Sequence, residues 1–264
     1  MEAIMTNRKS IYLDCIGIKD MEEALKAAKA AGFAAVELPT IPEEKRAEVK
    51  ELFKKYDLIC PSIMTSGAWD NIATSHDPEV RAKSAECYKR AIDTAVYMGC
   101  DTILTVPGAV TADIKYEDAL VNAKKTLDLV VPYAEEKGIT LAIENVWNKF
   151  LLTPVDMANF IDSFNSEYVK SYFDIGNVVF YGFPQQWINT LGKRIKRVHI
   201  KGFYMTGFDG FKWCSLLEST IDWKAVMTEL KAAGYTNWIT AELGPDDRGL
   251  AGMTEDMDKI IALA

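Results

Sequence analysis

The chain has 264 residues, of which 49% are hydrophobic and 26% are charged, so it can bury the large core of an ordinary globular protein. Its formal net charge of -8 excludes the broadly basic surface that nucleic-acid binding requires. The five cysteines form no CxxC pair and indicate free thiols in a reducing compartment. No run of about 18 apolar residues occurs and the start lacks a signal-peptide core, so we expect a cytoplasmic protein without membrane contact.

Short apolar runs alternate with helix-forming stretches along the chain. Eight runs are predicted to be strands: residues 10–15, 33–38, 58–64, 101–106, 139–144, 169–174, 195–200 and 237–242. Eight strand–helix units in a chain of this length favour α/β architecture as a closed (β/α)₈ TIM barrel over an open doubly wound sheet. The first unit lacks the GxGxxG turn of a dinucleotide-binding sheet, so we expect no nucleotide cofactor.

Helix signals separate the predicted strands. Four stretches combine helix-forming residues with a terminal glycine: residues 19–32, 76–99, 116–138 and 222–234. Asp77 and Pro78 are typical of a helix start, and Pro132 is expected to kink the third of these helices. The weakest helix signal lies at residues 184–191. Because no linker or low-complexity stretch divides the chain, we expect one domain over residues 1–264.

Polar residues stand at the carboxyl ends of the last four predicted strands, where the active site of a TIM barrel lies. They are Glu144, Asp174, His199 and Glu242. Three neighbouring carboxylates repel one another unless a cation or protons offset their charge. Together with one imidazole they match Mn²⁺, Co²⁺ or Mg²⁺, and neutral His199 would donate its other ring N–H to a further acceptor. Exposure to solvent is a sufficient reason for one polar residue at a strand end. It is a poorer explanation for polar residues at the ends of four successive strands.

Five further residues are expected near this rim or beside a helix start. Glu37 ends the second strand and would bind substrate hydroxyls or form a salt bridge inside the barrel mouth. Lys201, just beyond the seventh strand, would hold an anionic group or pair with a rim carboxylate. Trp147 and Trp213 offer faces that suit the C–H face of a sugar, or they pack within their loops. His76 adjoins a helix cap, where a loop role is expected.

The order and spacing of four motifs resemble those of a known superfamily. The motifs are AIENVW, FDIGN, RVHIKGF and GYTNWITAEL. They are similar to those of the sugar-phosphate isomerase/epimerase superfamily, which has a xylose-isomerase-like TIM barrel and includes ketose 3-epimerases, pentulose-phosphate epimerases, hydroxypyruvate isomerase and inosose dehydratase. The resemblance covers nearly the whole chain. It implies that Glu144, Asp174, His199 and Glu242 hold the metal, with Mn²⁺ expected first, and that Glu144 and Glu242 form an acid/base pair. It also implies a homo-oligomer, either a dimer or a tetramer.

Three positions bear on the substrate. Asn177 matches the DxGN form of the pentulose-phosphate epimerases and is expected to contact substrate. Phe150 stands where the 3-epimerases of free ketoses tend to have a glutamate. Gly202 replaces the aspartate of the common HxKD motif, which removes a contact to substrate or to a metal ligand. These departures leave the sugar and the reaction type open.

The expected activity is metal-assisted 3-epimerisation of a small ketose or ketose phosphate. The metal would chelate the carbonyl and a neighbouring hydroxyl and stabilise an enediolate, while two glutamates exchange a proton on opposite faces. A sugar or inosose dehydratase using the same site, or a sugar-binding protein without turnover, are the alternatives. Phosphodiester hydrolysis of the endonuclease IV type is excluded, because that enzyme needs a histidine-rich trinuclear zinc site and this chain has two histidines.

Overall fold

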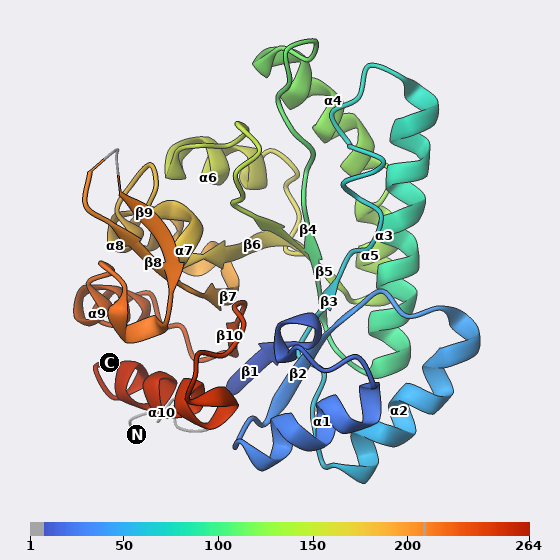
Figure 1. Ribbon diagram of the computed structural model, residues 1–264. Coiled ribbons are helices and arrows are strands. Elements are labelled where there is room, and N and C mark those ends of the chain that lie inside the picture. The colour runs from blue at the N-terminus through green and yellow to red at the C-terminus, as the bar shows by residue number, and fades with distance from the viewer. Residues whose placement is uncertain (1–7, 208–209) are drawn as a thin grey trace.

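The computed structural model describes residues 8–207 and 210–264. Its centre is a closed barrel of parallel strands in the order β1-β10-β7-β6-β5-β4-β3-β2 (Figure 1). The barrel strands are β1 (Lys9–Tyr12), β2 (Ala35–Pro39), β3 (Ile63–Met64), β4 (Thr102–Thr105), β5 (Thr140–Glu144), β6 (Val169–Asp174), β7 (Ile195–Ile200) and β10 (Ile239–Ala241). Each overlaps one predicted strand. Because β1 pairs with both β10 and β2, the sheet has no edge, which confirms the TIM barrel.

Helices surround the barrel (Figure 1). They are α1 (Met21–Ala30), α2 (Arg46–Lys55), α3 (Pro78–Met98), α4 (Tyr116–Asp128), α5 (Val131–Lys137), α6 (Pro154–Asp162), α7 (Ile175–Val178), α8 (Pro184–Leu191), α9 (Trp223–Ala232) and α10 (Gly249–Ile261). Short 3₁₀ helices cover Leu13–Ile16, Glu43–Lys45, Gly192–Arg194 and Leu216–Glu218. Within the described residues, none of the helices combines the length and apolar character needed to cross a membrane.

Most helix ends follow the predicted signals. The Asp77 side chain accepts a hydrogen bond from the Glu79 N–H, and Pro78 opens α3. The predicted helix over residues 116–138 is instead two helices, α4 and α5. Pro132 lies in the first turn of α5, where its missing N–H costs nothing, so the chain breaks before it rather than kinking at it.

A departure from the predicted alternation of strands and helices lies beyond the barrel. An antiparallel hairpin, β8 (Gly202–Met205) and β9 (Phe211–Cys214), follows β7 directly. Because β7 ends at Ile200, the hairpin stands on the carboxyl-end rim of the barrel, beside β6 and α7 in Figure 1. The hairpin therefore places residues that follow His199 next to the predicted site.

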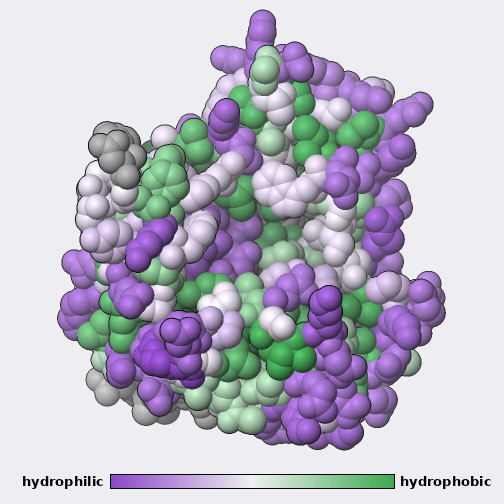
Figure 2. Space-filling view, viewed as in Figure 1, coloured by the Kyte–Doolittle hydropathy of each residue, from purple (hydrophilic) through white to green (hydrophobic). Residues whose placement is uncertain are grey.

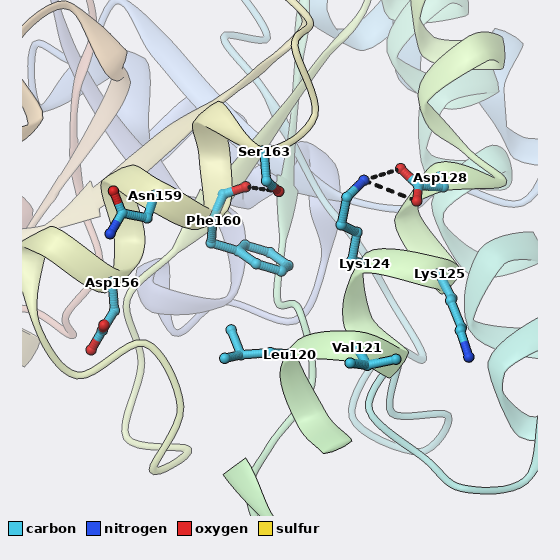
Figure 3. A pocket seen from close by; sticks show the side chains of 9 residues that line it. All are labelled: Leu120, Val121, Lys124, Lys125, Asp128, Asp156, Asn159, Phe160 and Ser163. Carbon is cyan, nitrogen blue, oxygen red and sulfur yellow. Dashed lines mark hydrogen bonds and ion pairs between the residues drawn. The ribbon is translucent and has the colours of Figure 1, made fainter. Parts of the chain in front are cut away.

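A groove of about 560 Å³ lies outside the barrel between α4 and α6 (Figure 3). Two of its polar groups have partners within it: Lys124 donates to Asp128, and the Ser163 hydroxyl donates to the Phe160 carbonyl. The groove is lined by helix residues and the residue after α6, and by none of the predicted site residues. The site therefore has to be sought at the strand ends.

Candidate metal centre and active site

The alternation of side chains along the strands directs the predicted ligands into the barrel mouth. Ala142 belongs to a small inner cluster of apolar residues, so Glu144, two residues further along β5, also points inward. On β6 the same relation holds between Tyr172 and Asp174. His199 on β7 pairs in register with Asp174. The period of the strands thus explains why these three side chains meet.

The four predicted ligands converge. One ligand atom each from Glu144, Asp174, His199 and Glu242 lies within 4.8 Å of the others. The Nδ1 atom of His199 is 3.1 Å from Glu144 Oε1 and 3.4 Å from Glu242 Oε2. It is 3.9 Å from Asp174 Oδ2. The Glu242 side chain is 20% exposed while the other three are buried, so the cluster opens toward solvent on the Glu242 side.

Lys201 balances part of this negative charge. Its ammonium lies 2.8 Å from Asp174 Oδ2 and also contacts Glu242. It therefore pairs with rim carboxylates, the second of its two expected roles. A Cβ atom at Gly176 would collide with the Lys201 side chain, so the glycine of the DIGN motif leaves room for the lysine stem.

The donor set fits a divalent cation. Asp174 Oδ2 is buried and, among the described residues, has an ion pair but no aligned hydrogen bond. Such an oxygen is costly to bury, and a cation would satisfy it. Three carboxylates and one imidazole nitrogen are ligands that Mn²⁺, Co²⁺ and Mg²⁺ accept.

Glu37 lies beneath the imidazole and not on the open rim. It is fully buried, and its Oε2 is 2.8 Å from His199 Nε2. Its Oε1 accepts hydrogen bonds from Ser62 Oγ at 2.8 Å and from Tyr172 OH at 2.9 Å. Of the two roles expected for Glu37, the structure favours the salt bridge inside the barrel mouth over contact with substrate. With a cation on Nδ1, the other ring nitrogen, Nε2, would carry the proton and donate it to this carboxylate.

Two asparagines fix the ends of β5 and β6. The Asn145 side chain donates to the Asp174 carbonyl at 2.8 Å and accepts from the Asp174 N–H at 2.9 Å. The Asn177 amide donates to the Asn145 carbonyl at 2.9 Å, and its N–H donates to Asp174 Oδ1 at 2.7 Å. Asn177 was expected to contact substrate, but it is buried and these bonds position Asp174.

Sequence patterns did not reveal every member of the site. Asn145 follows Glu144 in the IEN motif and was detectable there, whereas nothing next to Ser62 or Tyr172 in the sequence indicates that either one contacts Glu37. Their hydrogen bonds to Glu37 span 25 and 135 residues of sequence.

Trp147 donates its Nε1 hydrogen to the Asn177 carbonyl at 2.9 Å and stacks on Trp213 with 5.1 Å between ring centroids.

Burial controls the protonation of the cluster. It raises the pKa of Glu144 to about 7, and the charge of Glu242 adds to this effect. Burial likewise raises the pKa of Asp174 to about 6, against the opposing charge of Lys201. At Glu242 burial also acts upward, but His199 and Lys201 outweigh it and hold the pKa well below its usual range. Two of the three carboxyl groups therefore retain protons toward neutral pH when no cation balances them.

The melting temperature of the metal-free protein is expected to fall between about pH 5 and about pH 8. The pKa of Glu144 is raised from 4.5 to about 7, so between these values the folded state binds a proton that the unfolded state has lost. Stability is lost as the pH rises under that condition. Scanning calorimetry of chelated protein over this pH range checks it. Glu144→Gln is expected to flatten the slope, and a wild-type melting temperature that rises over this range would contradict the prediction.

Gly202, which replaces the aspartate of the common HxKD motif, has a steric explanation. A Cβ atom there would collide with the carbonyl oxygens of Cys214 and Ser215, because β9 passes directly over this position. The close approach of β9 therefore leaves no room for an aspartate side chain at position 202.

Gly202→Asp is expected to destabilise the protein by about 1–3 kcal/mol, because the hairpin must move to accept the side chain. Thermal unfolding measures this loss. The matched control is Gly244→Asp, which adds the same charge in the loop after β10, where a Cβ atom meets open space. Equal stability of the two variants would show that the collision has no consequence.

Comparisons with solved structures agree with this fold. A D-tagatose 3-epimerase-like protein superposes with a TM-score of 0.84 at 20% identity, covering 97% of each chain. The 3-keto-D-glucoside 4-epimerase of E. coli has a TM-score of 0.81 at 15% identity, covering 97% of this chain and 99% of that one. D-allulose 3-epimerase from Methylomonas sp. has a TM-score of 0.76 at 18% identity, covering 96% of both.

Sequence comparisons find two relatives of 26% identity. An uncharacterized protein of Methanocaldococcus jannaschii is 26% identical over 174 residues, which are 64% of this chain and 59% of that protein's length. A putative L-ribulose-5-phosphate 3-epimerase of Haemophilus influenzae is 26% identical over 238 residues, which are 84% of this chain and 83% of that one. The model of the xylose isomerase-like TIM barrel family matches residues 25–263. This chain therefore belongs to the xylose isomerase-like TIM barrel family.

Proposed function

We propose that this chain is a metal-dependent sugar epimerase that inverts a carbon next to a ketone. The observation that carries the proposal is the convergence of four ligand atoms within 4.8 Å at the barrel mouth, two of them from glutamates. The names of the relatives point the same way, since they include a putative L-ribulose-5-phosphate 3-epimerase and a 3-keto-D-glucoside 4-epimerase. Carbohydrate epimerisation is the chemistry these names share.

Each residue has a defined part in this proposal. Glu144, Asp174, His199 and Glu242 would hold the cation. A divalent cation, Mn²⁺ in our proposal, supplies Lewis acidity that polarises the ketone and acidifies the adjacent C–H bond. The two glutamates then act as base and acid on that carbon.

The order of strands supports a two-sided proton transfer. β5, which carries Glu144, and β10, which precedes Glu242, lie on either side of the β6–β7 pair in the barrel. A sugar bound between the glutamates presents one face to each of them. One glutamate takes the proton and the other returns a proton to the opposite face, which inverts the carbon. Both would need to act, so loss of either one stops inversion.

Further properties follow as parts of the proposal. The five cysteines are free thiols, which supports a reducing compartment such as the cytoplasm. We propose a single domain over residues 1–264 and a homo-oligomer, either a dimer or a tetramer.

Product identification tests the proposal. The Mn²⁺-loaded protein is incubated with D-tagatose, L-ribulose 5-phosphate and methyl 3-keto-β-D-glucoside, and the products are followed by NMR. We expect one of them to be converted to its epimer. A dehydrated product that absorbs in the ultraviolet, with no epimer, would instead make the protein a lyase. Saturable binding without any product would make it a sugar-binding protein.

A further inference from the structure

Aromatic side chains from three neighbouring rim loops gather beside the metal ligands. We define the aromatic platform as Trp147, Phe180, Phe211 and Trp213, whose exposed fractions are 43%, 43%, 51% and 49%. Adjacent rings of the platform have centroids 5.1–5.5 Å apart. Large apolar side chains that stay half exposed in one contiguous group are typical of a ligand-binding surface.

The platform is held in place from beneath. Trp147 is fixed by the hydrogen bond from its Nε1 to the Asn177 carbonyl. Phe203 is fully buried and meets Trp147 and Trp213 edge-on, with centroid distances of 5.6 Å and 4.9 Å. Gly202 lets β8 and β9 approach closely enough to bring these rings together. A surface fixed in this way loses little entropy when a ligand covers it.

The platform adjoins the metal ligands. The Lys201 ammonium lies 5.3 Å from the centroid of Trp213 and 2.8 Å from Asp174 Oδ2, so one side chain touches both. Figure 2, viewed into the barrel, shows a hollow over its middle, and the hairpin lies to the left of the barrel in Figure 1. A molecule whose ketone lies at the cluster can therefore reach the aromatic rings with its other end.

The charges of the rim disfavour a phosphate group. The rim segments that carry or adjoin the platform, residues 145–150, 175–183, 201–222 and 242–248, contain four basic and six acidic residues. Two of the four basic ones already have partners: Lys201 pairs with Asp174 and Glu242, and Arg248 pairs with Asp246 and Asp256. A phosphate needs several unengaged cations or N–H donors, whereas a stacked indole suits the C–H face of a sugar or an aromatic ring.

We infer that the substrate is a neutral sugar ketone joined to a second ring, and that this ring lies on the aromatic platform. The part of the inference that concerns the ketone rests on the proposed function. Beyond the proposed function, the inference adds that the substrate carries a second ring, and that no phosphate stands at the end of the substrate which lies on the platform.

Matched ligands test the inference. D-fructose, D-fructose 6-phosphate and isomaltulose share one ketose and carry hydrogen, phosphate or a glucosyl ring on the same oxygen. Methyl and phenyl 3-keto-β-D-glucosides form a second matched pair. Binding is measured by saturation-transfer NMR with Mg²⁺-loaded protein, and KM and kcat are measured for any ligand that turns over with Mn²⁺. In at least one matched set, we expect the ligand with the second ring to bind roughly tenfold more tightly than its partner.

Variants locate the effect. Trp213→Ala is expected to remove the preference for the second ring, through KM rather than kcat, and Trp213→Phe to restore part of it. The matched control is Tyr97→Ala, which removes an exposed aromatic ring from the last turn of α3 and is expected to keep the preference.

Three results would overturn the inference. They are tighter binding of the phosphate than of either ring compound, equal binding within every matched set, or a Trp213→Ala variant that changes oligomeric state on gel filtration while keeping the preference. If the protein catalyses hydrogen exchange on a ketose with a single ring and shows no preference for ligands with a second ring, this inference fails while the proposed function stands. Preferred binding of ring compounds without exchange on any sugar would instead count against the proposed epimerisation.

Discussion

Glu242→Gln is expected to lower kcat by about 10²–10⁴-fold, the usual contribution of a general acid or base. Glu242 is the ligand that faces solvent, with 20% of its side chain exposed, and is therefore the one that a bound sugar reaches first. Glutamine keeps the size of the side chain and one oxygen for the cation, but it cannot accept a proton. Steady-state kinetics on the substrate found by the product assay measures the loss, with bound metal determined in the same samples.

The control for this variant is Asp247→Asn, which removes an exposed carboxylate in the same loop. We expect its kcat to match the wild type. Glu144→Gln is expected to be impaired as strongly as Glu242→Gln, because each glutamate serves one face of the sugar. Full turnover by either glutamine variant, at full metal occupancy, would show that the acid/base pair is wrongly assigned.

Glu37→Leu is expected to weaken Mn²⁺ binding by roughly 10–100-fold, the range found when the partner of a metal-bound histidine is removed. The substitution takes the acceptor away from three buried donors, which are His199 Nε2, Ser62 Oγ and Tyr172 OH. Ser62 Oγ and Tyr172 OH lie 3.2 Å apart and can bond each other, but each donor that is left unsatisfied costs about 1–3 kcal/mol, so the melting temperature falls as well. Titration calorimetry with Mn²⁺ and thermal unfolding measure the two effects.

Two companion variants separate metal positioning from general stability. Glu37→Gln keeps an oxygen that can accept from His199 and is expected to recover part of the affinity. Ser62→Ala removes one donor to Glu37 without touching His199, so it should lower the melting temperature but leave Mn²⁺ affinity close to wild type. If Ser62→Ala weakens Mn²⁺ binding as much as Glu37→Leu does, Glu37 acts only through stability.

The barrel and the ligand set could be predicted from sequence because both depend on local patterns. A run such as LAIE reads as a strand from its own composition, and the topology of a parallel barrel brings the ends of neighbouring strands to one rim. Glu144 and Asp174 could therefore be placed together although they lie 30 residues apart. Helix ends at Gly99 and Gly138 follow from the left-handed conformation that glycine adopts there.

Features that depend on contacts across the barrel could not be predicted. The partner of Glu37 is 162 residues away, and nothing in VELP distinguishes a carboxylate under a histidine from one that faces substrate. The hairpin was missed because its strands are four residues each and because β8 begins two residues after β7 ends. Gly202 looked like a lost functional group, and only the proximity of Cys214 and Ser215 shows that the chain needs a glycine there.

Hydrogen exchange in D₂O tests whether the metal site carries out proton transfer on the sugar. The protein is stripped of metal, divided, and one half is reloaded with Mn²⁺, and each half is incubated with the substrate identified above. With the reloaded protein we expect deuterium to enter the sugar at the carbon next to the ketone while the epimer forms, and we expect almost no epimer from the stripped protein or from reloaded Glu242→Gln. Equal epimerisation by stripped and reloaded protein would show that the reaction does not depend on the metal.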